Sequence, residues 1–203
     1  MASMLDVVMA MIIGGTLMVI IANSSIISSR SATNYAEEQL VQRLLVETTQ
    51  AIEGDFRNMG YNVSSDTITT VLEGRDSAIA YLSDYNNDGV VDQVKYYLGP
   101  PHELSFQNDS LRLIHRQINN VTPDDKIGMC TRFKLKYFTQ NETDTIETPV
   151  AAGELASIKL VEIILEVQSP YGLFVPTAGR NAFFATTMWR QTRLASQNLK
   201  RGE

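Results

Sequence analysis

The residues of this sequence best suited to chemistry lie between positions 84 and 92, in the stretch DYNNDGVVD. Oxygen ligands at the first, third, fifth, seventh and ninth positions of such a loop suit Ca²⁺, and a glycine at the sixth position permits a sharp turn. The sequence therefore predicts a calcium site whose ligands would be Asp84, Asn86, Asp88, the carbonyl of Val90, and Asp92.

A plain hairpin turn is the alternative interpretation of this stretch. The twelfth position, where a calcium loop carries a bidentate glutamate, is Lys95, and a strand pattern follows where a second helix would begin. Asn-Asn-Asp-Gly is also good turn chemistry without any metal. Calcium is the only cofactor that the sequence suggests, and the alternative stays open.

Asp6 is the second residue with chemical meaning. It stands at the edge of a long apolar stretch, where a carboxylate is costly unless it is paired, so such groups are usually functional. One hypothesis is that Asp6 pairs with a cation of a neighbouring subunit during assembly. The alternative is that Asp6 lies at headgroup level as an acid at a helix N-terminus, favoured by the helix dipole.

We predict no catalytic residue and hence no enzyme. The acidic pairs Glu37–Glu38 and Glu162 with Glu166 fit solvated faces of a helix or a strand, and no nucleophile stands in a motif such as G-x-S-x-G. The net charge of -6, with no basic run, argues against nucleic-acid binding, which needs a basic stripe.

The element that must position Asp6 is an apolar helix. From Leu5 to Ile27 the only charged residue is Asp6, and a helix of this length can cross a hydrocarbon core of about 30 Å. A cleavable signal would need a basic n-region, and a buried core helix would need partners on all sides. We therefore assign residues 1–29 to a single-pass transmembrane or filament-core helix.

The helical pattern continues past this span. Residues Leu40, Leu44, Thr48, Ala51, Ile52 and Phe56 recur at three- and four-residue spacing, and Gly60 supplies a stop signal. One helix is therefore expected from about residue 4 to about residue 58. Its amphipathic part, residues 30–60, should pack on a domain formed by residues 61–203.

Beyond Gly60 the hydrophobic period changes to two, which predicts strands. The expected strands are Thr67–Leu72, Ala78–Leu82, Val90–Leu98, Leu111–Gln117, Thr131–Phe138, Ile158–Val167 and Ala182–Arg190. Short turn-rich connections favour antiparallel pairing. The predicted fold class is α+β: a long N-terminal helix packed on one antiparallel β-sheet.

This plan resembles that of the type IV pilins and pseudopilins, and most closely the W-type minor pilins and the J-type pseudopilins of type II secretion. The segment from Ile52 to Tyr61, IEGDFRNMGY, is similar to the "DLRxAGY" stretch of those families. The segment from Asp84 to Leu98, DYNNDGVVDQVKYYL, is similar to their "DxDGxxDxVxYxL". The strand order near the C-terminus also fits.

The start of the sequence departs from the family pattern. Family members carry a basic leader ending in glycine, cut before a Phe-Thr-Leu-Ile-Glu-like run, and neither stands in this sequence. The register is kept if Ala2 is the first mature residue, because Asp6 then occupies the fifth position, where the family has its glutamate. We therefore expect processing to differ from that of typical prepilins.

The resemblance implies a structural, non-enzymatic subunit of a pilus-like filament or a secretion pseudopilus. Its implied partners are other pilin-like subunits, the inner membrane before assembly, and an assembly platform. The β domain would lie in the periplasm or outside the cell. The alternatives are a membrane-anchored binding module, dependent on calcium or not, that does not polymerise, and an extracytoplasmic enzyme.

Overall fold

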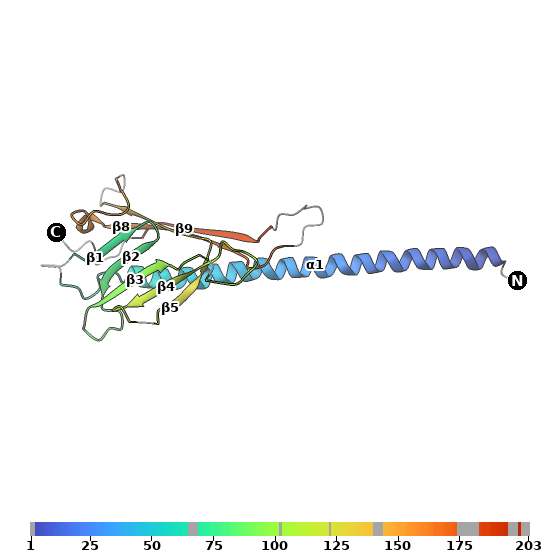
Figure 1. Ribbon diagram of the computed structural model, residues 1–203, viewed down its shortest axis with the longest axis horizontal. Helices are drawn as coiled ribbons and strands as arrows, with labels where there is room; N and C mark the ends of the chain where they lie inside the picture. Colours follow the sequence, from blue (N-terminus) through green and yellow to red (C-terminus); the bar gives the residue numbers. More distant parts are fainter. Residues whose placement is uncertain are drawn as a thin grey trace.

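The computed structural model describes residues 3–64, 69–101, 103–121, 123–139, 144–173, 183–194 and 199. The architecture is α+β, as predicted: one long N-terminal helix packs by its C-terminal half against antiparallel sheets, and its N-terminal half extends away from them (Figure 1). The N-terminus therefore lies at the end of the molecule that is farthest from the β domain.

Helix α1 runs from Met4 to Arg57, 54 residues and about 80 Å at 1.5 Å per residue. Ser3 caps its N-terminus. At the other end Gly60 has a φ of 77°, a left-handed conformation that glycine adopts without strain. The Gly60 amide then donates to the Leu82 carbonyl at 2.9 Å, which joins the helix end to the first sheet.

The strands form two antiparallel sheets. The first has the order β1-β2-β3-β4-β5 and the second the order β7-β6-β8-β9. Their bounds are β1 Val71–Arg75, β2 Ala78–Ser83, β3 Asp92–Leu98, β4 Arg112–Ile118, β5 Asp125–Cys130, β6 Arg132–Phe138, β7 Thr145–Ile146, β8 Leu160–Gln168 and β9 Thr186–Leu194; a short 3₁₀ helix, η1, spans Leu155–Ser157.

The predicted packing of the helix on antiparallel strands is confirmed, and the structure divides these strands between two sheets. The chain crosses between the sheets at Thr131, one residue after β5 and one before β6, and the Thr131 amide donates to the Glu166 carbonyl at 2.9 Å. Strand β5 is absent from the predicted strands, because two of its residues, Asp125 and Lys126, are charged and exposed. The predicted strand starts at Thr67 and Ala182 lie outside the described residues.

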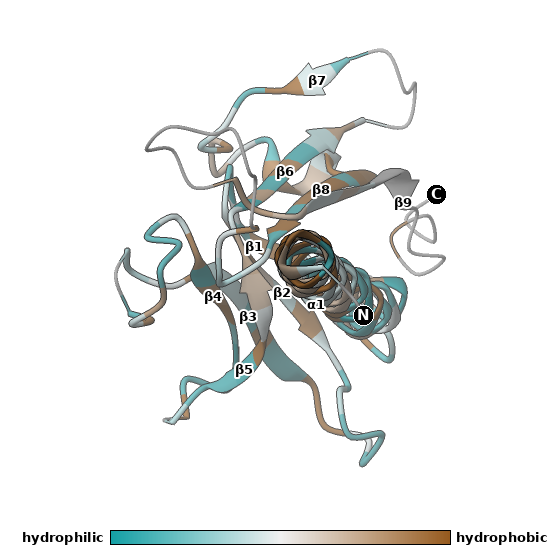
Figure 2. Cartoon of the chain, turned by 90° about the vertical axis from the view of Figure 1, so that its right-hand side faces the viewer, coloured by the Kyte–Doolittle hydropathy of each residue, from teal (hydrophilic) through white to brown (hydrophobic). Residues whose placement is uncertain are grey.

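The core lies between the two sheets and the second half of α1. The helix contacts β5 of the first sheet and β8 and β9 of the second, and Figure 2 shows it lying in the angle between them. Its buried residues are Val41, Thr48, Thr49, Ile52 and Phe56. Burial of a large apolar side chain such as Ile52 or Phe56 contributes about 1.5–3 kcal/mol.

Phe56 connects the helix to the first sheet. Its ring meets Tyr81 of β2 at 5.8 Å and Tyr96 of β3 at 5.4 Å, both edge to face. All three side chains are buried. The expected helix face is slightly rotated, because Val41 is buried while Leu40 is 39% exposed. The helix therefore enters the domain near Val41.

Gly128 allows the close approach of β5 to the helix. A Cβ atom at Gly128 would lie 2.8 Å from Thr48 Cγ2 and even closer to Thr48 Oγ1. Because Thr48 is branched at Cβ and sits in a helix, its side chain has little freedom to move away. The glycine is therefore required by packing and not by backbone conformation.

We predict that Gly128→Ala lowers the free energy of unfolding by about 1–3 kcal/mol, because the added methyl group overpacks the contact. Thermal or urea unfolding of the full chain measures the change. Thr48→Ala should restore part of the loss when it is combined with Gly128→Ala. Gly153→Ala is the matched control, since a Cβ there has no neighbour within 4 Å. Equal effects of the two glycine variants would contradict this packing.

Candidate functional site

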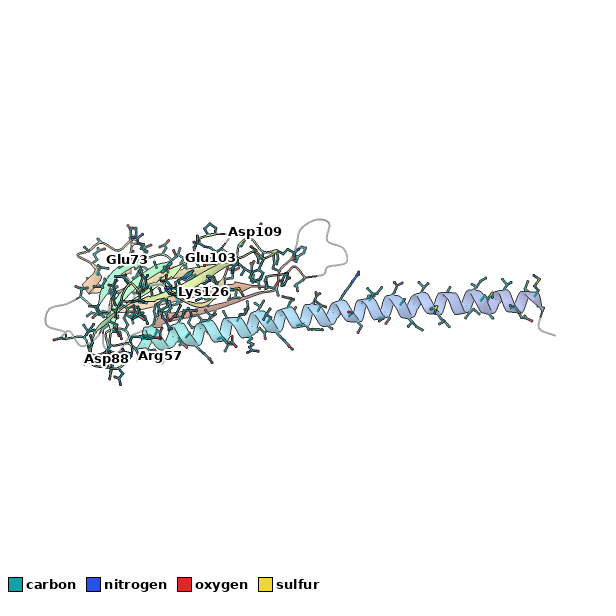
Figure 3. All side chains as sticks on the ribbon, turned by 60° about the horizontal axis from the view of Figure 1, so that its bottom comes forward. Arg57, Glu73, Asp88, Glu103, Asp109 and Lys126 are labelled. Atoms are coloured by element: carbon teal, nitrogen blue, oxygen red, sulfur yellow. The ribbon has the colours of Figure 1, made fainter. Side chains whose placement is uncertain are left out.

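The first candidate site is the surface of the N-terminal half of α1. From Ser3 to Thr33 every residue is exposed. The large apolar side chains on it are Met4, Leu5, Val7, Val8, Met9, Met11, Ile12, Ile13, Leu17, Met18, Val19, Ile20, Ile21, Ile26 and Ile27. They project on all sides of the helix, away from the β domain (Figure 3). This helix is long and apolar enough to cross a membrane.

One polar side chain within this surface forms its hydrogen bond inside the helix. The Thr16 hydroxyl donates to the Ile13 carbonyl at 2.9 Å, so it does not need water. At Gly14 and Gly15 an added Cβ would meet nothing within 4 Å, which leaves the backbone open to close approach by another helix. An apolar surface of this extent marks a site of interaction with lipid or protein.

Asp6 lies at the start of this surface and forms a capping box with Ser3. The Ser3 amide donates to Asp6 Oδ2 at 2.9 Å, and the Asp6 amide donates to Ser3 Oγ at 3.3 Å. The structure of the single chain thus gives Asp6 the role of an N-terminal acid of the helix, which the dipole favours. Its role in assembly stays a prediction.

The second candidate site is the turn from Asp84 to Asp92. Asp84 is 5% exposed, and its Oδ1 accepts from the Asp88 amide at 3.0 Å. Its Oδ2 accepts from the Gly89 amide at 2.9 Å and from Asn62 Nδ2 at 3.0 Å. One carboxylate therefore closes the turn and ties it to the segment that follows α1.

The other predicted ligands also serve the turn. Asn86 Oδ1 accepts from the Asp88 amide at 3.1 Å, and Asp88 Oδ1 accepts from the Val90 amide at 2.7 Å. Asp92 is buried, and its Oδ2 accepts from the Tyr85 amide at 3.2 Å. Asn87 and Gly89 supply the left-handed conformations that the turn needs, with φ of 60° and 87°.

The structure therefore gathers these residues as a hydrogen-bonded turn. Within the part of the chain that the structure describes, which includes all of residues 84–92, no group of three or more His, Cys, Asp or Glu side chains is placed to hold a metal ion. The carboxylate oxygens accept instead from amides of their own turn and from the side-chain amides of Asn62 and Asn119. The turn interpretation accounts for this geometry, and calcium binding stays a prediction.

We predict that Asp84→Ala lowers the free energy of unfolding by about 2–3 kcal/mol. The backbone amides of Asp88 and Gly89 and the side-chain amide of Asn62 all lose their hydrogen-bond acceptor. The loss should be the same with chelator and with millimolar calcium, measured by thermal melts of the full chain. Asp109→Ala, an exposed acid of another loop, should change stability by about 0.5 kcal/mol or less. A calcium-dependent gain that Asp84→Ala abolishes would contradict the metal-free turn.

A third site, which sequence reasoning missed, is a polar cluster at the C-terminal end of α1. Asp55 Oδ2 accepts from Arg116 Nη1 at 2.9 Å and from the Tyr96 hydroxyl. Arg116 Nη2 also donates to Asp125 Oδ2 at 2.8 Å, and its guanidinium lies 5.0 Å from the Tyr85 ring centre. The cluster joins the helix to β3, β4 and β5.

Electrostatics fixes the protonation states of this cluster. Burial lowers the pKa of Arg116, but its hydrogen bonds to Asp125 and Asp55 outweigh burial and raise it, so the guanidinium stays charged. Burial, and then the charge of Asp55, raise the pKa of Tyr96. Two carboxylates face one guanidinium, so the cluster retains one formal negative charge.

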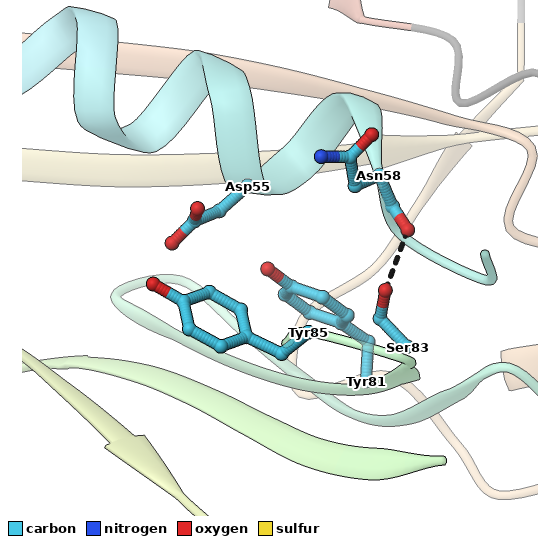
Figure 4. A pocket seen from close by; sticks show the side chains of 5 residues that line it. All are labelled: Asp55, Asn58, Tyr81, Ser83 and Tyr85. Carbon is cyan, nitrogen blue, oxygen red and sulfur yellow. Dashed lines mark hydrogen bonds between the residues drawn. The ribbon is translucent and has the colours of Figure 1, made fainter. Parts of the chain in front are cut away.

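A cavity of about 200 Å³ lies beside this cluster, lined by Asp55, Asn58, Tyr81, Ser83 and Tyr85 (Figure 4). Ser83 Oγ donates to the Asn58 carbonyl at 2.7 Å and so fixes one wall. The Tyr81 hydroxyl is buried and has no hydrogen-bond partner among the described residues. Burial raises the pKa of Tyr81 well above its usual value, so this hydroxyl keeps its proton.

Sequence distance explains why this site was missed. Asp55 and Arg116 are 61 positions apart, and only the packing of α1 against the first sheet brings them together. His115 of β4 has partners that are also distant in sequence: its Nε2 lies 3.1 Å from Glu103 Oε2 and its ring stacks on Tyr97. Tyr81 and Tyr96 lie in strands that the sequence predicts, but no local pattern identifies their polar neighbours.

Comparison of the chain with protein-family models, with curated proteins and with solved structures finds no match. The function is therefore inferred from the sequence and the geometry of the chain itself.

Proposed function

We propose that this protein is a structural, non-enzymatic subunit of a pilus-like filament or secretion pseudopilus, anchored in a membrane before assembly. The observation that carries the proposal is the single continuous helix α1. Its first half is apolar and exposed on every side, and its second half is the spine of a β domain. This division of one helix is what a subunit needs if it is stored in lipid and then packed with its copies.

Exposure of the apolar first half of α1 to water costs free energy. A helix that is apolar all round is stable only where lipid or other helices surround it. The β domain covers none of it, since burial on α1 starts near Val41. A bilayer covers one such helix at a time, and a bundle of copies replaces lipid with equivalent apolar contacts. Gly14 and Gly15 favour close approach in that bundle.

The proposal includes partners and a location. The partners are further pilin-like subunits along α1, the inner membrane, and an assembly platform in that membrane. The β domain is proposed to lie in the periplasm or outside the cell. Support for both comes from the sequence resemblance, carried by the segments IEGDFRNMGY and DYNNDGVVDQVKYYL.

A second candidate function is a membrane-anchored binding module that does not polymerise. The cavity beside Asp55 favours it, because the unpartnered Tyr81 hydroxyl lies in the β domain and not on the helix. The two functions differ in what the N-terminal half of α1 does. In a binding module, this half of the helix needs only to be apolar. In a filament, the Asp6 carboxylate must pair with a cation of a neighbouring subunit.

We predict that Asp6→Ala reduces incorporation into sheared, pelletable filaments roughly tenfold or more, because a buried cation of the neighbouring subunit loses its counter-charge. The melting temperature of the β domain should not change, since Asp6 is exposed far from that domain and its carboxylate accepts from the Ser3 amide. Quantitative immunoblots of the sheared fraction and the membrane fraction give the readout.

The matched control is Ser3→Ala. It removes the hydroxyl half of the capping box and leaves the carboxylate, so it should retain incorporation within about twofold of the wild type. Asp6→Glu should rescue most of the loss. Normal incorporation of Asp6→Ala, or an equal loss in Ser3→Ala, would contradict the assembly role.

A further inference from the structure

The cavity at the end of α1 contains an unusual group for a buried site. The Tyr81 side chain is 1% exposed, and its hydroxyl has no hydrogen-bond partner among the described residues. A buried hydroxyl without a partner costs free energy comparable to a lost hydrogen bond, so native proteins rarely keep one unless something fills the place. The hydroxyl faces the same space as the Asp55 carboxylate (Figure 4).

The lining of the cavity selects the charge of what can fill that place. Among the described residues that line it, Asp55 is the only carboxylate and none is basic. Both hydrogen bonds that Asp55 receives go to Oδ2, which leaves the lone pairs of Oδ1 for another donor. Arg116 is shared with Asp125, so the neighbourhood still carries a formal negative charge. An anion would be repelled here, and a cation attracted.

The geometry of the acceptors selects the kind of cation. Asp55 and Tyr81 present oxygens to the same small volume, and Ser83 Oγ, which also lines it, donates its hydrogen to the Asn58 carbonyl. Its lone pairs therefore remain as acceptors. A primary ammonium group is a compact charge with three donors. The volume of about 200 Å³ is below that of sites for drug-sized ligands and fits the end of one side chain.

We propose that this cavity binds a primary ammonium group of the kind that ends a lysine side chain. The ammonium would donate to Asp55 Oδ1 and to the Tyr81 hydroxyl oxygen. Tyr85 and Asn58, both exposed, form the rim through which the aliphatic stem would enter. The site lies at the C-terminal end of α1, in the β domain and far from the apolar N-terminal half of the helix.

The test uses the full chain in detergent micelles at fixed ionic strength. The probes are Nα-acetyl-lysine methylamide and n-butylammonium, and binding is measured by calorimetry and by the rise in melting temperature. Two analogues are the controls: the Nζ-trimethylated lysine derivative, which has the charge but no N–H donor, and acetyl-norleucine methylamide, which has the chain but no charge. Wild type should bind both amines and neither control.

Tyr81→Phe is the decisive variant, because it keeps the ring and removes only the hydroxyl. Without probe its melting temperature should equal or exceed that of the wild type, since no hydrogen bond is lost. With probe its affinity should fall roughly tenfold, as expected for a lost bond to a charged group. Tyr137→Phe is the matched control: the Tyr137 hydroxyl donates to the Arg75 carbonyl at 2.9 Å, so this variant should melt lower yet bind the probe normally.

Each outcome decides the proposal. Binding of the lysine derivative that Tyr81→Phe weakens supports a site for a protein lysine. Binding of n-butylammonium alone supports the ammonium site and assigns it to free amines. No binding of either amine would mean that water alone fills the cavity, and the proposal would fail. Equal binding by Tyr81→Phe, or binding of the norleucine control, would overturn it as well.

Discussion

The apolar surface of the first half of α1 is the constraint from which the rest of the account follows. Removing a large aliphatic side chain from water gains about 1.5–3 kcal/mol, and such side chains cover this half of the helix on every face. A fold that buried them would need a second domain around residues 4–33. The β domain instead begins its contact near Val41, and we propose that lipid or other copies of the helix supply the cover.

The second half of the same helix sets the shape of the β domain. Ile52 and Phe56 are fully buried between the two sheets, and Gly128 lets β5 approach Thr48. The polar cluster of Asp55, Arg116 and Tyr96 then fixes the helix end against the first sheet. Apolar packing and charge thus fix the second half of one continuous helix to the β domain. This continuity suits the proposed subunit, which would be held by its helix.

The sequence was a good guide wherever the pattern was local. The helix from residue 4 to 57 follows from the absence of proline and from the spacing of apolar residues, and Gly60 marks its end in both the prediction and the structure. The strands around Tyr81, Tyr96 and Leu135 follow from period-two alternation. Strand β5 was missed because its glycine and its charged residues are explained only by contacts in three dimensions. These contacts are the close approach to Thr48 and the pairing with β4.

The candidate sites were less accessible to prediction for the same reason. The residues from Asp84 to Asp92 were found by type and spacing, but which atoms their carboxylates accept from depends on the turn's own amides and on Asn62, 22 positions away. The cavity beside Tyr81 needed the helix end, β2 and the β2–β3 turn to be placed together. No local sequence pattern predicts that a buried hydroxyl will lack a hydrogen-bond partner.

The central claim is that the first half of α1 is covered by lipid before assembly, and spin-label accessibility tests it most directly. Nitroxides at Ile12, Leu17 and Ile21, with Gln42 as a reference on the domain side, are compared in native membranes for relaxation by oxygen and by a water-soluble nickel complex. The account predicts that the three apolar positions respond to oxygen and not to nickel, while Gln42 responds to nickel. Strong nickel relaxation at all four positions would contradict it.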